Sequence, residues 1–204
     1  MTPPRPPVCE AGGPQGVRPM RADARRNRAR LLKAAEDVFA AEGTSARTEE
    51  IARRAGVGIG TLFRHFPTKE ALVEAIVLAR VERLVEEVEA LAAEGDPATA
   101  FFAFFARTVA EVEAKKTYSE LVANGFVDVG TAAPGLRRRL REGIGALLAR
   151  AQDAGTVRGD IGVPEVMNLL VGAVRAAERA GQDGELRERT LGIVLDGLRP
   201  AGYR

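Results

Sequence analysis

Between residues 47 and 66 the sequence has two short helical patterns joined by a glycine-containing turn, and this unit constrains the fold more than any other feature. The first pattern begins at Thr48, where a threonine is a suitable N-cap, and it ends at Gly56. The second spans roughly residues 59–65 and is followed by Pro67, which interrupts helices, and by Thr68, which we expect to cap the next helix. Two short helices joined by a turn of three or four residues describe a helix-turn-helix, whose second helix enters the major groove of DNA. The apolar residues that we expect to pack inside this unit are Ile51, Ala52, Ala55, Val57, Leu62 and Phe66.

Positive charge gathers on this unit and on the helix that precedes it. Residues 1–69 carry 13 Lys and Arg against 7 Asp and Glu, a net charge of +6, whereas residues 70–204 have a net charge of −4. Arginines at positions 25, 26, 28 and 30 load the start of the preceding helix, where the helix macrodipole favours acidic residues. Phosphate groups would offset this cost, so we expect the front of the chain to meet a nucleic acid.

Several kinds of chemical site are excluded by the residue inventory. The chain has one Cys and one His, too few for a disulfide framework, for a Cys/His zinc site or for a helical di-iron site. A Ser-His-Asp triad could use only His65, which lies in the helix-turn-helix. No run of about 18 apolar residues is present, so we expect no membrane span. We therefore expect no metal and no cofactor.

Apolar residues three and four positions apart predict one long helix over residues 69–94. Further helices are predicted from about residue 23 to Gly43, from residue 97 onward, and over residues 134–155, 164–180 and 185–199. The expected fold is all-α: an N-terminal three-helix helix-turn-helix head, joined by the long helix to a C-terminal helical bundle.

The stretch that begins at Thr48, TEEIARRAGVGIGTLFRHFPTKEAL, resembles the DNA-binding signature of the TetR family of bacterial transcriptional regulators. Residues 34–43 are similar to the first helix of that family. The resemblance implies a cytoplasmic, ligand-responsive regulator, most often a repressor, that binds a near-palindromic operator as a homodimer. It also implies a DNA-binding domain over 22–84, with its recognition unit at about 47–66, and a regulatory and dimerisation domain over 85–204. Residues 1–21 are rich in Pro and Gly and lack an apolar period, which predicts a disordered tail.

The resemblance assigns roles within the head residue by residue. Thr48 would cap its helix beside a phosphate, and Gly60 would let the backbone approach the duplex. Thr61 would contact a base or a phosphate, His65 would lie near the DNA backbone, and Lys69 would hold a phosphate together with backbone amides. The residues expected to bind DNA are Arg47, Thr48, Gly58, Ile59, Gly60, Thr61, Phe63, Arg64, His65 and Lys69.

Three positions depart from the usual pattern of the family. Gly58 stands where Ser or Thr is frequent, Ile59 where a polar or basic residue is frequent, and Phe63 where Tyr is usual. Ile59 could contact thymine methyl groups, and the arginines at 25–30 together with Arg47 could supply phosphate contacts in place of the missing hydroxyl. Structural roles are the alternatives: Phe63 could pack the small core of the head, His65 could be a surface residue, and Thr48 could serve as a cap alone.

Residues 101–105 contain four phenylalanines, and this cluster is either core or the wall of an apolar cavity. Under the cavity hypothesis a small, largely apolar effector binds in the C-terminal domain. The residues expected to line such a site are Phe102, Phe105, Tyr118, Asn124, Phe126 and Met167.

The last two expected helices are apolar on more than one side, which predicts an isologous interface between two copies of the chain. The residues expected at this homodimer interface are Leu170, Val174, Ala177, Leu191, Val194, Leu195 and Leu198.

Two other function classes compete with a ligand-responsive regulator. One is a DNA-binding protein that responds to no ligand, against which the Phe-rich helix argues. The other is a small all-α enzyme acting on an apolar substrate, against which the lack of paired His and Cys ligands argues. An enzyme would show turnover, whereas a regulator would prefer one DNA sequence.

Overall fold

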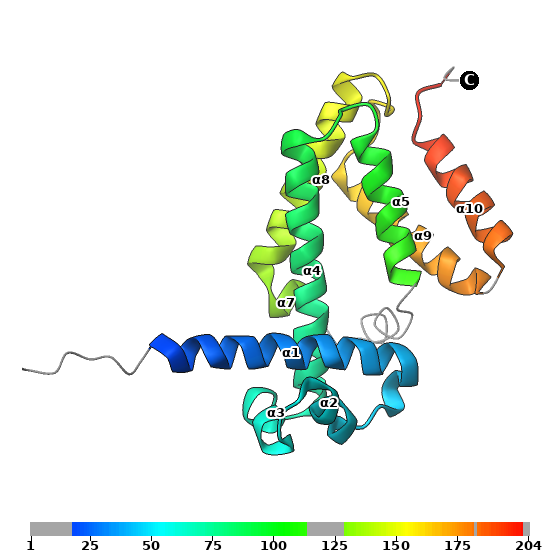
Figure 1. Ribbon diagram of the computed structural model, residues 1–204. Coiled ribbons are helices and arrows are strands. Elements are labelled where there is room, and N and C mark those ends of the chain that lie inside the picture. Colours follow the sequence, from blue (N-terminus) through cyan, green and yellow to red (C-terminus); the bar gives the residue numbers. More distant parts are fainter. Residues whose placement is uncertain (1–17, 114–128, 182, 202–204) are drawn as a thin grey trace, which may run out of the picture.

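The structure is a computed structural model that describes residues 18–113, 129–181 and 183–201. Its described residues form helices and no strand, so the all-α prediction is confirmed (Figure 1). The helices are α1 (Arg18–Glu42), the short 3-10 helix η1 (Gly43–Ser45), α2 (Thr48–Ala55), α3 (Ile59–His65), α4 (Lys69–Glu94), α5 (Ala100–Glu113), α7 (Val129–Ala132), α8 (Pro134–Asp153), α9 (Val163–Ala180) and α10 (Gly184–Gly197).

The head consists of α1, α2, α3 and the first turns of α4. In Figure 1, α1 lies across the base of α4, and α2 and α3 lie beneath α1. Large apolar side chains from all four helices are fully buried between them, which gives this small unit a core of its own. These side chains are Leu31, Val38, Phe39, Ile51, Leu62, Leu72 and Ile76.

Glycines end the helices of the head at two sharp changes of direction. Gly43 follows α1 with a φ of 65°, and Gly56 follows α2 with a φ of 66°. Both lie in the left-handed region that glycine adopts at little cost, as the sequence predicted. Val57 packs against the core of the head immediately after the second turn and fixes the angle between α2 and α3.

Helix α1 begins earlier than the sequence predicted. The absence of an apolar period suggested a tail up to residue 21, but the helix begins at Arg18. Arginine and alanine are good helix formers, so this segment can be helical without an apolar face.

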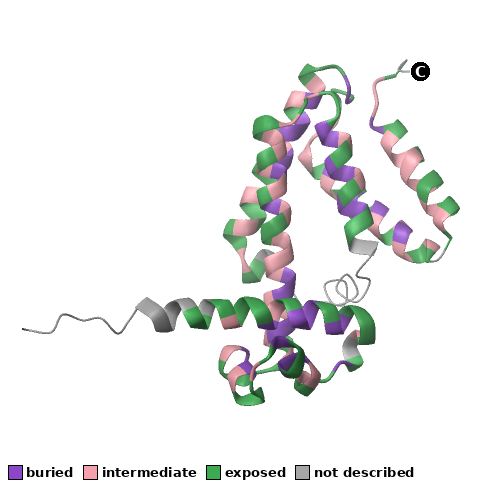
Figure 2. Cartoon of the chain, viewed as in Figure 1, coloured by how far each residue is buried: buried purple, intermediate pink, exposed green. Residues whose placement is uncertain are grey.

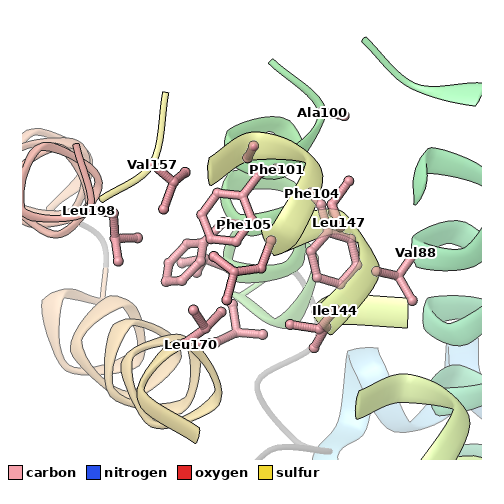
Figure 3. Close-up of a cluster of buried hydrophobic side chains, with 14 of the residues drawn as sticks. Val88, Ala100, Phe101, Phe104, Phe105, Ile144, Leu147, Val157, Leu170 and Leu198 are labelled. Atoms are coloured by element: carbon pink, nitrogen blue, oxygen red, sulfur yellow. The ribbon is translucent and has the colours of Figure 1, made fainter. Parts of the chain in front are cut away.

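In the C-terminal domain α8 and α5 pack against the upper half of α4, α9 packs against α5 and α8, and α10 packs against α9 (Figure 1). The rings of Phe101, Phe104 and Phe105 on α5 are at most 3% exposed and lie among side chains of α8 and α9 (Figure 3). The structure therefore shows these three phenylalanines as core residues. Phe102 is only half-buried, and Arg199 stacks over its ring at 4.4 Å from the centroid.

Helix α4 is the one described element that contributes to both cores. Leu72, Val73, Ile76 and Val77 belong to the core of the head, and Val88 belongs to that of the C-terminal domain. The buried positions of α4 fall in two groups, at residues 72–77 and 85–88 (Figure 2).

Polar contacts fix α4 to two of its neighbours, α1 and α8. Glu36 on α1 pairs with Arg83 at 2.6 Å, and Glu89 receives two hydrogen bonds from Arg139 on α8, at 2.9 and 2.6 Å. Arg150 of α8 donates to the carbonyl oxygens of Ala92 and Gly95 at the end of α4, which satisfies backbone groups that a helix end leaves unpaired. A displacement of α4 relative to α8 must therefore break several contacts.

Helices α4 and α8 approach each other closely at Gly143. A Cβ atom added there would lie 2.6 Å from Cγ1 of Val88, a stiff side chain in the core. We expect Gly143→Ala to lower the free energy of unfolding by about 1–3 kcal/mol, as overpacked cores do. Urea unfolding followed by circular dichroism measures this.

The control for this substitution is Gly135→Ala in the same helix, where an added Cβ meets nothing within 4 Å. Gly135→Ala should leave the stability unchanged or raise it by up to about 1 kcal/mol. Equal stability of the two variants would contradict the close approach of α4 and α8.

Candidate nucleic-acid interface

Helix α3 turns one side toward the core and the other toward solvent. Leu62 is fully buried, whereas Ile59 and Phe63 are 39% and 43% exposed. Ile59 and Phe63 are four residues apart, so they lie on the same side of the helix, and Arg64 next to them is also exposed. Phe63 is therefore not part of the core of the head, and α3 presents an outward surface of two apolar side chains beside a cation.

Gly58 and Gly60 are exposed at the start of this surface. A Cβ atom added at either position would meet no atom within 4 Å. The fold itself does not require glycine at position 60, although glycine costs a helix about 1 kcal/mol relative to alanine. The absence of a side chain leaves room for another molecule to approach the backbone of α3.

The beginning of α2 differs in detail from the sequence prediction. Arg47 is the N-cap, with extended φ and ψ of −90° and 137°, and Thr48 is the first helical residue. Because its backbone is already helical, Thr48 does not cap the helix; its hydroxyl lies 3.5 Å from the Glu49 carboxylate. The capping role assigned to Thr48 was wrong, and its half-buried side chain stands beside the exposed Arg47.

Lys69 makes contacts inside the head. Its Nζ donates a 2.7 Å hydrogen bond to the carbonyl oxygen of Ala46 and lies 5.6 Å from the centre of the Phe39 ring. Thr68 caps α4 as the sequence predicted, since its hydroxyl accepts a 3.1 Å bond from the Ala71 amide. Lys69 thus ties the start of α4 to the segment before α2, a role that sequence reasoning missed because Ala46 is 23 residues away.

His65 and Thr61 are half-buried at the edge of the surface. The ring of His65 is tilted against that of Phe66, with centroids 6.3 Å apart. The guanidinium of Arg28 lies 5.3 Å from the centre of the same Phe66 ring. This contact brings an arginine of α1 to the end of α3.

Glu50 holds the two arginines of α2 in place. Its carboxylate accepts two 2.7 Å hydrogen bonds from Arg53 and one of 2.9 Å from Arg54. These bonds lower the pKa of Glu50 from 4.5 to about 2, with the Arg53 bond the largest cause. The carboxylate therefore stays ionised at any pH at which DNA binding would be measured.

The described part of the chain offers no competing chemical site. No group of three or more His, Cys, Asp or Glu in these residues could hold a metal ion. In the same residues no helix is long and apolar enough to cross a membrane. The outward surface of α3, with the basic residues around it, is the strongest candidate site, because the major groove of DNA admits an α-helix.

Three of the six residues expected to line an effector site lie in the part of the chain that the structure describes, and all three belong to the C-terminal core or pack against it. Phe105 is 1% exposed in the core, Phe102 and Met167 are half-buried at its edge, and Tyr118, Asn124 and Phe126 lie outside the described residues. Phe105 is thus a core side chain, because it faces α8 and α9 and not an opening.

The residues expected at a dimer interface divide into two sets. Leu170, Ala177 and Leu198 are buried in the core of their own chain, so their assignment to the surface is corrected. Val174, Leu191, Val194 and Leu195 are half-buried and pack against that core.

The most exposed large apolar side chains of α9 and α10 are ones that sequence reasoning left out of the interface: Leu169, Val171, Leu186 and Ile193. In α9 the spacing of the apolar residues could have identified the exposed ones. Val166, Leu170, Ala173 and Ala177 follow the spacing of one buried side, so the apolar residues outside that spacing must face elsewhere.

The Glu50 contacts predict a pH dependence of stability. Because the folded-state pKa is lowered, the stabilisation by Glu50 is present above pH 4.5 and is lost as the pH falls toward about 2. We expect Glu50→Gln to unfold at lower urea concentration than wild type at pH 7, and the difference to shrink over that range. Glu49→Gln, which removes a neighbouring charge, is the control; a difference that stays constant with pH would contradict the assignment.

Comparison with known proteins identifies both halves of the chain. Residues 31–76 match the family described as bacterial regulatory proteins, tetR family. Residues 96–200 match the family described as transcriptional regulator SbtR-like, C-terminal domain. The two matches correspond to the head and the C-terminal domain described above.

Individual relatives agree with the family matches. The crystal structure of a TetR transcription regulatory protein from Mycobacterium vanbaalenii is 46% identical, with a TM-score of 0.69, covering 89% of this chain and all of that one. The transcriptional repressor KstR2 of Rhodococcus jostii (strain RHA1) is 29% identical over 97% of this chain and 98% of its own length. The regulator SAR0097 of Staphylococcus aureus (strain MRSA252) is 35% identical over 79 aligned residues. These residues make up 38% of this chain and 41% of that relative, so the chain spans less than half the length of this relative.

The outward surface of α3, the two family matches and the near-complete overlap with a solved TetR protein agree with one another. The chain belongs to the TetR family and is a DNA-binding transcriptional regulator, not an enzyme.

Proposed function

We propose that this regulator is a repressor that binds a near-palindromic operator as a homodimer and leaves it when a small, largely apolar effector binds the C-terminal domain. The observation that carries the DNA-binding part is the exposed pair Ile59 and Phe63 beside Gly60. The name of KstR2, a transcriptional repressor, supports repression over activation.

In the proposed complex the surface of α3 enters the major groove. Ile59 and Phe63 contact thymine methyl groups, which distinguish A·T from G·C pairs in that groove. Arg47 and Arg64, both exposed, bind phosphates and set the register of the head on the duplex. Gly60 lets the backbone of α3 come close to the DNA.

The proposed dimer buries the apolar side chains that α9 and α10 leave exposed. Val171 is 58% exposed and Ile193 is 69% exposed, so each leaves apolar surface that a partner could remove from water. Gly172 lies beside Val171, and a Cβ there would meet nothing within its own chain. A second copy can approach α9 closely at this glycine, and the symmetric arrangement presents two heads about 34 Å apart, one turn of the duplex.

The proposed effector acts through α4, because this helix belongs to both cores. A ligand changes operator affinity only if it binds one state better than the other, and coupling of about 1–3 kcal/mol is typical. Phe102 and Met167, half-buried at the edge of the C-terminal core, are the described residues best placed to contact an apolar ligand.

One observation favours a second candidate, a repressor that responds to no ligand. Phe101, Phe104 and Phe105 are packed as solid core, which removes the main argument that they line a cavity. Thermal shift and operator affinity measured across a panel of apolar compounds separate the two candidates. A compound that both stabilises the protein and weakens operator binding supports the effector; the absence of any such compound favours the second candidate.

We expect Gly60→Ala to weaken operator binding by about tenfold or more, because a methyl group would hold α3 off the duplex at a cost of at least about 1.4 kcal/mol. The thermal midpoint of the free protein should stay the same or rise, since the added Cβ meets nothing. Fluorescence anisotropy with a duplex selected from a random library measures the affinity, with Gly135→Ala as control. Unchanged affinity would contradict the placement of α3 against DNA.

Val171→Asp and Ile193→Asp test the dimer. Because each places a charge in the proposed interface, we expect either one to halve the mass measured by light scattering at micromolar concentration and to weaken operator binding. Ala146→Asp, at an exposed position on α8, should change neither. A wild-type protein with the mass of a single chain would contradict the proposed dimer.

A further inference from the structure

The first half of α1 is not needed to build the head. Leu31 is the first residue of α1 in the core, and none of the side chains described from residue 23 to residue 30 is buried. At 1.5 Å per residue, the segment Arg18–Arg30 extends about 20 Å beyond that core. Figures 1 and 2 show it projecting past α3, with exposed positions dominating its described part.

This projecting segment is strongly basic. Residues 18–30 contain six arginines and one aspartate. The aspartate, Asp23, pairs with Arg26, while Arg28 contacts the ring of Phe66 and Arg30 contacts the amide of Asn27. Neither the ring of Phe66 nor the amide of Asn27 carries a negative charge, so these contacts do not neutralise the charges of Arg28 and Arg30.

Several arginines outside this segment have a carboxylate partner. Arg83, Arg139 and Arg158 each pair with a carboxylate, at distances of 2.6 Å. Arginines in the first turns of a helix oppose its macrodipole and repel one another, which destabilises the free segment. A bound polyanion reverses both effects.

The contact of Arg28 shows which side of α1 would meet that polyanion. Its guanidinium stacks on Phe66, the residue that directly follows α3. Positions 21 and 25 lie on the same side of the helix as position 28, because they precede it by about two turns and one turn. Positions 26 and 30 lie on the opposite side, together with Asp23.

We propose that the first half of α1 is a second DNA-contacting element, in which the side that carries positions 21, 25 and 28 binds backbone phosphates outside the bases read by α3. The inference rests on the proposed operator binding and extends it to the DNA flanks. The contacts are to phosphate, so they add affinity for any flanking sequence and do not select bases.

The test compares two double variants that remove equal charge from opposite sides of one helix. The first is Arg21→Gln with Arg25→Gln, and the matched control is Arg26→Gln with Arg30→Gln. Glutamine and arginine have similar helix propensities, and circular dichroism verifies that the helix is retained. Each protein is titrated onto a selected operator with about ten flanking base pairs per side and onto one trimmed to the bases read by α3.

We expect the wild type to prefer the long duplex. The first variant should bind the long duplex about tenfold or more weaker than wild type, the scale of one charge-assisted hydrogen bond. Its log–log salt slope should fall by roughly 0.9 for each phosphate that the variant no longer neutralises. Binding to the trimmed duplex should not change, and the control variant should weaken binding to the long duplex much less.

Two outcomes would overturn the inference while leaving operator binding intact. One is a wild type that binds both duplexes equally well. The other is an equal reduction of affinity in both double variants, which would show diffuse attraction and no contact by one side of α1. If the wild type selects no sequence at all, the proposed function fails first, and that result is distinct from either of these.

Discussion

The rest of this structure depends on one constraint: α4 must satisfy two hydrophobic cores at once. Its first turns are buried in the head and Val88 is buried in the C-terminal domain, so neither core can repack without involving the same helix. Arg83 ties α4 to α1 through Glu36, and Arg139 ties it to α8 through Glu89. Packed interiors respond to a ligand by shifting between discrete arrangements, which makes a shared helix an effective link between two domains.

The head, which α4 links to the C-terminal domain, holds α3 in a fixed position. Its core fixes α3 through Leu62, while Ile59 and Phe63 face outward, where apolar side chains gain nothing from contact with water. The fold does not require the glycine at position 60 either, because there is space for a side chain there. These residues are explained together by a partner that approaches α3 closely.

Sequence reasoning succeeded where signals are local. Gly56, Pro67 and the cap at Thr68 mark ends of helices through their own backbone chemistry, and the bounds of α2, α3 and α4 agree with the expectation. It failed where the answer depends on tertiary contacts. Lys69 bonds to a carbonyl 23 residues away, and Leu198 fills the core of its own chain because core and interface select the same apolar side chains. The prediction for Thr48 failed for a different reason. The extended backbone of Arg47 makes Arg47 the N-cap, and the sequence alone does not distinguish the two neighbouring residues.

Selection of DNA from a random-sequence duplex library is the measurement that tests the central claim most directly. If paired heads read successive major grooves through α3, the enriched sequences will share a two-fold symmetric site whose half-sites are centred about 10 base pairs apart, or a whole number of turns. Enrichment of no common sequence, or of one isolated half-site without symmetry, would contradict the account of a dimeric DNA reader.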